Sequence, residues 1–402
     1  MPERFPYALE RVGVIMRPEP GNPHEEEGVL NPAAVVAPSG KVIMYPRLVA
    51  KGNRSRIGRA EIVITDGIPQ SIRREGILLF PDRGWEHGSD HGGVEDPRLT
   101  WIVSLGLWVM TYVAFGPLGP RGALLVSKDL ENWERLGPIQ YTYEDHLEVD
   151  LNLFPNKDLL WFPEPVTGPN GRPCYAFIHR PMWEIEGQDV TLPAGITDAR
   201  ASIWISYVDV DEATFDARAL LRPWGHRQLL APEFPWEALK IGGGPPPLRV
   251  PEGWLLLHHG VSGSMTANSF EPQKNVHYAA GAVLLDATDP TKVLARTIEP
   301  LLSPETNDER EGIVGNVVFP TAIIEVEGDQ FVLYGMADEA IGVARIVRQL
   351  QADGSVTETP AQAGVAITSG IPQAVGVDQP AVVTAAVPMM STALAGQDAL
   401  IQ

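Results

Sequence analysis

The chain of 402 residues has one cysteine, Cys174, so it cannot form an internal disulfide. This fits a reducing compartment, and we expect a cytoplasmic protein. The N-terminus lacks the basic and apolar regions of a signal peptide, and no apolar run is long enough to span a bilayer. Basic residues are scarce, with 31 Lys and Arg against 51 Asp and Glu and a net charge of −20. This deficit argues against nucleic acid or a membrane surface as a partner.

Few long helices can fit, because 37 prolines and 39 glycines are scattered along the chain. The apolar runs are short, and turn residues bound them. Residues 33–45 read as a hairpin with Pro-Ser-Gly-Lys at its tip, and residues 253–258 and 330–334 as single strands. The sequence therefore predicts an all-β protein.

A loose internal repeat refines this prediction. Apolar strands run into Asp-containing turns five times, at residues 64–67, 126–130, 207–211, 284–290 and 350–354. The spacing is roughly 60 to 80 residues, which suits one small antiparallel sheet per repeat. We therefore predict a five-bladed β-propeller over residues 1–350, although strand–Asp–turn units occur in any all-β protein.

The C-terminal part of the chain has a different composition. From about residue 354 it is rich in Ala, Val, Thr, Gln and Pro, with very few charges and no aromatic residue. Residues 356–367 could add a strand. We expect residues 351–402 to form an extension that wraps the surface, packs on a neighbouring subunit or is disordered.

The segment most suggestive of chemistry is Gly-Gly-Val-Glu-Asp-Pro-Arg, residues 92–98. It places Glu95 and Asp96 where a Gly-rich loop enters an apolar strand, so that the loop gives access and the strand rigidity. Apolar cover and the neighbouring Arg98 can shift a carboxyl pKa in either direction. The alternative is a plain turn with a local Asp–Arg ion pair.

Cationic and polar residues beside Gly or Pro turns form four further segments, at residues 47–59, 156–181, 240–247 and 258–260. In a propeller such strand ends converge near the axis, where they would suit a small oxyanion and a sugar. Each also has an ordinary explanation as a solvated lysine, a core histidine or an arginine that braces a loop. No motif predicts a metal or an organic cofactor.

These segments, in this order, resemble glycoside hydrolase family 130, the β-mannoside phosphorylases and related mannosidases. The resemblance covers nearly the whole chain up to about Arg345, and it implies a five-bladed β-propeller. The matching pieces lie at residues 55–58, 93–98, 110–112, 127–133, 156–158, 162–164, 179–181, 253–254, 259–260, 284–286, 316–320, 334–335 and 338.

The resemblance implies an inverting phosphorolysis of terminal β-mannosides, with Asp96 as the proton donor. Inorganic phosphate, a co-substrate, attacks the anomeric carbon to give α-mannose 1-phosphate and a shortened acceptor. The acceptor would lie beside residues 179–183. By motif, the phosphate ligands are Asn156, Arg180, Lys240 and His259, and the residues that contact mannose are Arg47, Arg56, Glu95 and Asp338.

One departure from the family pattern keeps alternatives open. Pro155 stands where many of the phosphorylases carry an arginine, and Arg59 is a candidate to compensate. In the family's hydrolases glutamates activate water instead, and Glu233 and Glu237 are candidates for that role. The alternatives are an inverting β-mannosidase and a carbohydrate-binding propeller without activity. The expected partners are a small carbohydrate and phosphate, with a homo-oligomer formed through the tail as an option.

Overall fold

The structure is a computed structural model that describes residues 5–88, 92–183, 190–264, 273 and 275–349. All the described residues belong to one compact unit. The predicted C-terminal extension, residues 351–402, and its candidate strand at residues 356–367 lie outside the described residues.

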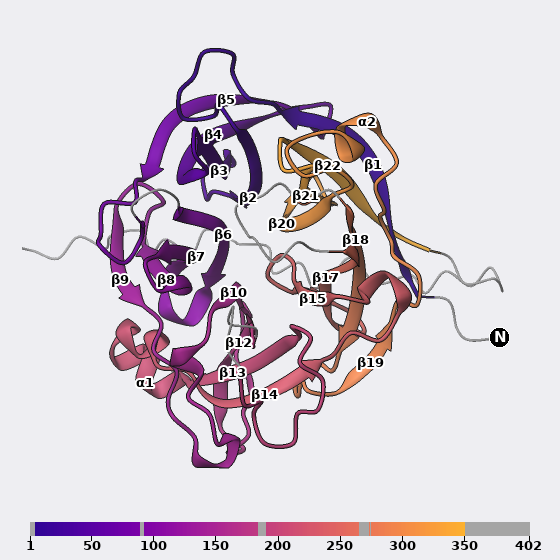
Figure 1. The fold of residues 1–402 in the computed structure, drawn as a ribbon. Helices are drawn as coiled ribbons and strands as arrows, with labels where there is room; N and C mark the ends of the chain where they lie inside the picture. The colour runs from indigo at the N-terminus through magenta and orange to yellow at the C-terminus, as the bar shows by residue number, and fades with distance from the viewer. Residues whose placement is uncertain (1–4, 89–91, 184–189, 265–272, 274, 350–402) are drawn as a thin grey trace, which may run out of the picture. The chain divides into compact units, whose positions relative to one another are not determined.

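The N-terminal half of the fold consists of two antiparallel four-stranded runs in one sheet (Figure 1). A short parallel pairing of Arg54 and Ser55 with Gly92 and Gly93 joins the two runs. The strands are β2 (Gly28–Val36), β3 (Val42–Ala50), β4 (Arg54–Thr65), β5 (Ile68–Leu79), β6 (Gly92–Ile102), β7 (Leu107–Gly116), β8 (Gly119–Ser127) and β9 (Trp133–Pro138).

Two further antiparallel sheets follow in chain order, each with one short extra strand. The first contains β10 (Asn156–Trp161), β11 (Val166–Thr167), β12 (Pro173–Pro181), β13 (Ile203–Asp209) and β14 (Trp224–Leu230). The second contains β15 (Lys240–Gly243), β16 (Leu248–Val250), β17 (Gly253–Ser264), β18 (Asn275–Leu285) and β19 (Val293–Arg296).

The last sheet combines the two ends of the described chain. Strands β20 (Val318–Val326), β21 (Asp329–Met336) and β22 (Ala340–Arg348) are joined by β1 (Tyr7–Met16), which pairs antiparallel with β22. This pairing ties the N-terminal segment to residues more than 300 positions later, with Tyr7 opposite Arg348. The ends of the described chain are thereby held in one sheet.

Helices are few and short among the described residues, as the Pro and Gly content predicts. They are the α-helices α1 (Val210–Phe215) and α2 (Asn307–Arg310) and the 3₁₀ helices η1 (Val103–Leu105), η2 (Asp145–Leu147), η3 (Leu151–Leu153), η4 (Ala217–Leu221) and η5 (Pro235–Glu237). The prediction of an all-β fold is confirmed.

The first strands of the successive four-stranded runs contact one another. β6 touches β2, β10 and β20, while β2 also touches β20 and β10 touches β15. Figure 1 shows these strands toward the middle, with later strands of each run farther out. Residues at the starts of these strands are therefore brought together from distant parts of the sequence.

Apolar side chains from neighbouring sheets fill the space between them. Val109 and Val113 of β7 pack in one cluster with Trp161, Phe177 and Trp204 from the next sheet, and all five are at most 1% exposed. Interiors packed to this degree deform little. The sheets therefore provide rigid walls for side chains that point toward the middle.

A substitution at Gly93 tests the close approach of β4 and β6. Its φ is +129°, and a Cβ there would overlap the backbone of Ser55, so Gly93→Ala adds steric conflict to backbone strain. We expect a loss of about 3 kcal/mol in the free energy of unfolding, measured by chemical denaturation.

Gly137→Ala is the matched control, because Gly137 has a φ of +119° and open space where the Cβ would lie. It should cost about 1 kcal/mol. Equal losses in the two variants would contradict the close approach of β4 and β6.

Candidate active site

A β-bulge in β6 sets the direction of Asp96. Glu95 pairs with Val113 and Arg98 with Thr111, so Asp96 and Pro97 together stand opposite a single residue of β7. Asp96 has a φ of 45°, in the left-handed region, which Asp tolerates better than most residues. Bulges re-aim side chains in this way next to functional sites.

Arg47 and Lys157 hold the adjacent carboxylates of Glu95 and Asp96 in a cluster that we call the acid cluster. Asp96 Oδ1 accepts hydrogen bonds from Asn31 Nδ2 at 2.9 Å and from Arg47 Nη1 at 3.1 Å. Glu95 accepts from Arg47 Nη2 and from Lys157 Nζ, each at 3.1 Å. The partner of Asp96 is thus Arg47, which contributes from another sheet run, and a local pair with Arg98 is not formed.

Asp338 completes the acid cluster, and its proton affinity differs from that of Asp96. Burial raises the pKa of Asp338 to about 6, and the charges of Asp96 and Glu95 add to this effect while Arg47 opposes it. Burial also raises the pKa of Asp96, but Arg47, Lys157 and the other nearby donors outweigh it and leave this pKa below its ordinary value. Two neighbouring carboxyls with separated pKa values are typical of acid–base sites.

A second group, the cationic cluster, lies around Gly242 of β15. Arg180 Nε donates to Asp158 Oδ2, and His259 Nε2 lies 3.6 Å from the same oxygen. A Cβ on Gly242 would overlap Asp158 and His259, so glycine is required for the three side chains to approach. These residues come from β10, β12 and β17.

Several buried donors without partners converge in the cationic cluster. Arg180 Nη1, Arg98 Nη2 and both ring nitrogens of His259 have no hydrogen-bond partner within the described part of the chain. Arg98 fixes its other nitrogens on the carbonyl oxygens of Gly244 at 2.7 Å and Asp96 at 3.1 Å. Because unpaired buried donors are costly, their convergence indicates a site for an anion.

The charge balance supports the same interpretation. Arg98 and Arg180 are at most 4% exposed, and Asp158 is the carboxylate that faces both. Burial lowers the pKa of His259 to about 3, and the charges of Arg180, Lys240 and Arg98 contribute, although Asp158 opposes the shift. His259 is therefore neutral at pH 7 and can donate through one ring nitrogen.

Aromatic rings pack against the cationic cluster and Lys240. Phe319 packs against His259 with ring centroids 4.2 Å apart and lies under the Arg98 guanidinium at 5.7 Å. Lys240 Nζ lies over the Tyr278 ring at 5.5 Å, and burial raises the pKa of Tyr278, with a contribution from Asp338. Arg98 joins this cluster to the acid cluster, because its Nη1 donates to the Asp96 carbonyl and its charge acts on both Asp96 and Asp158.

Most residues predicted from the sequence come together here, but two do not. Arg47, Glu95, Asp96 and Asp338 form the acid cluster, and Arg180, Lys240 and His259 belong to the cationic cluster. The Asn156 side chain instead bonds with His179 Nδ1 at 3.0 Å. Arg56 bonds with His24 and with the Arg54 carbonyl.

Several site residues were missed by the sequence analysis. Lys157 and Asp158 directly follow Asn156, and Arg98 ends the Glu-Asp-Pro-Arg motif, so their positions carried a signal. The sequence gives no signal for Asn31 and Tyr278, because their roles depend on contacts between strands distant in sequence.

The two glutamates considered as bases for a hydrolase lie elsewhere. Glu237 is fully buried, and its carboxylate accepts from His258 Nε2 at 3.0 Å, Arg296 Nη2 at 2.8 Å and the backbone nitrogen of Glu233 at 2.8 Å. The Glu233 side chain is 65% exposed and pairs with Arg296. Glu237 therefore stabilises the η5 turn.

Arg59 also lies elsewhere, since it donates to Glu75 and Glu131 and to the carbonyl of Leu130. It does not supply the donor that Pro155 lacks.

Within the described ranges, no group of three or more His, Cys, Asp or Glu is arranged to hold a metal ion. In those ranges no helix is both long and apolar enough to cross a membrane.

Comparison with known proteins places the chain in a family. The sequence model of a family described as beta-1,4-mannooligosaccharide phosphorylase matches residues 3–351. A 1,2-beta-oligomannan phosphorylase from Thermoanaerobacter is 30% identical over 337 residues, 82% of this chain and 93% of that protein. A beta-1,2-mannobiose phosphorylase from the same organism is 32% identical over 355 residues, 83% and 95% of the two chains. The solved beta-1,2-mannobiose phosphorylase from Listeria innocua superposes with a TM-score of 0.61 at 23% identity, covering 85% of this chain and 96% of that one.

The raised pKa of Asp338 predicts a pH-dependent stability. Between about pH 4 and 6 the folded protein keeps a proton that the unfolded chain releases, so this group's contribution to stability falls as the pH rises. Asp338→Asn lacks this titration. The difference in free energy of unfolding between Asp338→Asn and the parent should therefore shift in favour of the variant by about 2 kcal/mol from pH 4 to pH 7.

Chemical denaturation at both pH values measures this change, with Asp329→Asn as the control because that side chain is 52% exposed. A difference between Asp338→Asn and the parent that does not change with pH would contradict the burial of Asp338 beside Asp96.

The network around Glu237 predicts a structural loss. Glu237→Gln leaves Arg296 and His258 facing an uncharged group, and we expect the free energy of unfolding to fall by about 3 kcal/mol in chemical denaturation. Glu233→Gln, the exposed neighbour, should change it by less than about 0.5 kcal/mol. A Glu237→Gln protein of parental stability would show that the carboxylate is free for another role.

Proposed function

The chain belongs to glycoside hydrolase family 130, and from that premise we propose that it cleaves terminal β-mannosides by inverting phosphorolysis. The products are α-mannose 1-phosphate and a shortened acceptor. The observation that carries the proposal is the convergence of buried donors on Arg98, Arg180 and His259, which have no partner among the described residues, while Arg98 also bonds to the backbone carbonyl of Asp96.

Phosphate would bind in the cationic cluster. A phosphate dianion offers oxygens to Arg180 Nη1, Arg98 Nη2 and a ring N–H of His259, three donors that have no partner in the described part of the chain. Lys240 adds positive charge from the adjacent strand β15. Asp158 remains ionised, because burial raises its pKa but Arg180 and the other cations around it hold this pKa at about 2. It would orient Arg180 toward the phosphate.

Mannose would lie between the bound phosphate and the acid cluster. One phosphate oxygen attacks the anomeric carbon as the bond to the leaving oxygen breaks. A proton passes from Asp96 to that oxygen, directly or through a mannose hydroxyl. Phosphate itself is the nucleophile, so no second carboxylate has to activate water, unlike in an ordinary inverting glycosidase.

Asp96 is ionised in the free site, which fits a reaction in which phosphate binds before Asp96 donates a proton. Arg98 lies between the clusters and interacts with the charges of both Asp96 and Asp158. A bound dianion adds negative charge beside Arg98, and this raises the pKa of Asp96 toward the value a proton donor needs. Phosphate binding would thus prepare the acid.

The substrate class that we propose is manno-oligosaccharides and β-mannosyl-glucose, with Arg47, Glu95 and Asp338 on the mannose. The two Thermoanaerobacter relatives are named for β-1,2 linkages, whereas the family description names β-1,4 linkages. Both linkages therefore belong in the assay. Arg56 and Asn156 are retained as secondary candidates for mannose and phosphate, respectively.

The finer architecture and setting are also proposals. A closed five-bladed propeller over residues 1–350 is supported by five consecutive four-stranded runs and by the contacts among their first strands. Residues 351–402 would form an extension, and the protein would work in the cytoplasm, as the single cysteine suggests. A homo-oligomer remains open to test.

Phosphate dependence tests the reaction. The pure protein is incubated with β-1,2-mannobiose, β-1,4-mannobiose and β-1,4-mannosyl-glucose, with and without inorganic phosphate. We expect mannose 1-phosphate from at least one substrate, only when phosphate is present. Free mannose released at the same rate without phosphate would establish the hydrolase instead, and sugar binding without product would establish a non-catalytic module.

Asp96→Asn in the same assay tests the acid, because it keeps the shape but cannot donate the proton. We expect turnover to fall by a factor of about 10³. Glu233→Gln is the control, since that carboxylate is exposed and outside both clusters. Turnover of Asp96→Asn within a few fold of the parent would overturn the assignment.

A further inference from the structure

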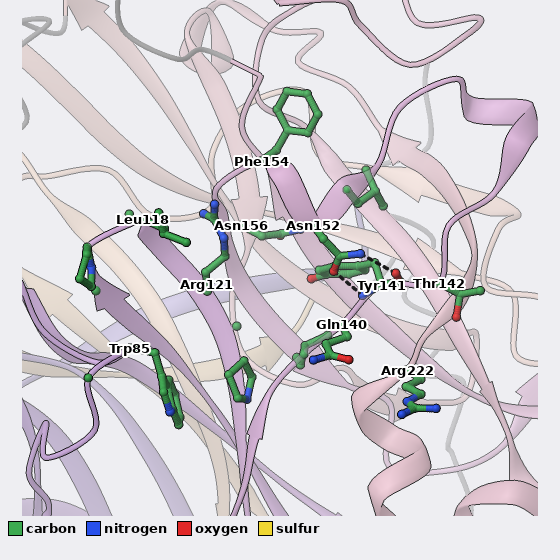
Figure 2. A pocket seen from close by; sticks show the side chains of 18 residues that line it. Trp85, Leu118, Arg121, Gln140, Tyr141, Thr142, Asn152, Phe154, Asn156 and Arg222 are labelled. Atoms are coloured by element: carbon green, nitrogen blue, oxygen red, sulfur yellow. Dashed lines mark hydrogen bonds between the residues drawn. The ribbon is translucent and has the colours of Figure 1, made fainter. Parts of the chain in front are cut away.

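A row of buried polar side chains crosses the sheet that begins with β10. One side chain comes from each of β10, β12, β13 and β14, and all are at most 2% exposed: Asn156, His179, Ser206 and His226. The row ends at the backbone carbonyl of Thr142. Figure 2 shows its two end residues, Asn156 and Thr142, in the wall of a hollow of about 670 Å³. The proposed reaction gives the serine and the two histidines no role.

Four hydrogen bonds join the row from end to end. Asn156 Nδ2 lies 3.0 Å from His179 Nδ1, and His179 Nε2 lies 2.8 Å from Ser206 Oγ. Ser206 Oγ lies 2.7 Å from His226 Nδ1, and His226 Nε2 lies 2.8 Å from the Thr142 oxygen. Each imidazole therefore uses both of its ring nitrogens within the row.

The Thr142 carbonyl sets the direction of every hydrogen bond, because a carbonyl oxygen only accepts. Burial lowers the pKa of both histidines, so at pH 7 each is neutral and carries one ring proton. His226 then donates from Nε2 and accepts at Nδ1 from Ser206, which in turn accepts from His179 Nε2. His179 Nδ1 is left as an acceptor, so the Asn156 amide presents its NH₂ group to the ring.

The row supports a strand end where the β10–β12 ladder is short. A register shift interrupts the ladder after Lys157, and on the site side of it the ladder contains two residue pairs, Asn156 with Pro181 and Lys157 with Arg180. Pro181 has no N–H to donate. Lys157 of the acid cluster directly follows Asn156, and Arg180 of the cationic cluster directly follows His179. The bond between the Asn156 and His179 side chains therefore ties together the two residues that precede these cations.

We propose that Ser206 is a positioning residue, which fixes the tautomer of His179 and the Asn156 amide and so holds the strand ends that carry Lys157 and Arg180. The inference rests on the proposed function and adds to it a residue that is fully buried and touches neither phosphate nor sugar. Without the Ser206 hydroxyl, His179 Nε2 loses its acceptor. The ring proton then moves to Nδ1, which lies 3.3 Å from Asn156 Oδ1, and the amide turns over.

Ser206→Ala tests the inference, because it removes the hydroxyl and leaves the strand in place. Nitrogen-15 NMR of the imidazoles reports which ring nitrogen carries the proton. We expect the Nε2–H tautomer on His179 and His226 in the parent, and the Nδ1–H tautomer on His179 in the variant. In calorimetric titration with inorganic phosphate and no sugar, the dissociation constant of the variant should rise about fivefold, the effect of one lost hydrogen bond.

Ser202→Ala is the matched control. Ser202 lies directly before the same strand and is also fully buried. Its hydroxyl accepts from Trp204 Nε1 at 3.1 Å and from Gln228 Nε2 at 2.9 Å, outside the row. Ser202→Ala should lose as much stability as Ser206→Ala in chemical denaturation, but keep the parental His179 tautomer and phosphate affinity.

Four results would overturn the inference. They are an Nδ1–H tautomer on either histidine of the parent, unchanged His179 resonances in Ser206→Ala, an unchanged phosphate affinity in that variant, and an equal loss of affinity in both variants. The last result would show a general loosening of the sheet. A parent that binds no phosphate would contradict the proposed function, and with it the role assigned to Ser206.

Discussion

The site depends on two guanidinium groups, those of Arg98 and Arg180, buried with too few partners. Asp158 is the carboxylate that faces both, and one nitrogen of each group has no hydrogen-bond partner in the described structure. Burying unmatched positive charge is expensive. The packed sheets keep these groups in place. A bound dianion would pair with the unmatched donors, and the interaction would contribute to its binding energy. Unmatched donors also occur elsewhere among the described residues, and what sets these apart is that they converge beside Asp96 and Asp158.

Backbone features around the site position its side chains. The bulge in β6 and the left-handed conformation of Asp96 turn its carboxyl toward Arg47, while the Arg98 side chain anchors the carbonyl of Asp96. Gly242 leaves room for Asp158 and His259 to approach each other. Asp96 and the cationic cluster are therefore coupled through Arg98, and an anion bound in the cluster would raise the proton affinity of Asp96.

Much of this could be predicted from the sequence, for identifiable reasons. The all-β fold followed from short apolar runs and scattered Pro and Gly, and the Glu-Asp-Pro-Arg motif marked Glu95 and Asp96, which the structure places in the acid cluster. The partner of Asp96 could not be predicted, because Arg47 reaches it from another strand run. Asn156 was predicted as a phosphate ligand, yet its side chain bonds to His179. Strand alternation at β10 directs Lys157 and Asn156 to different sides, which composition and spacing do not reveal.

The central claim is that the partnerless donors form a phosphate site, and a crystal structure of the protein with inorganic phosphate tests it most directly. The account predicts a phosphate ion bonded to Arg98 Nη2, Arg180 Nη1 and His259, with Asp158 still on Arg180. Phosphate bound elsewhere, or a cationic cluster that stays without phosphate at a concentration that supports turnover, would contradict it.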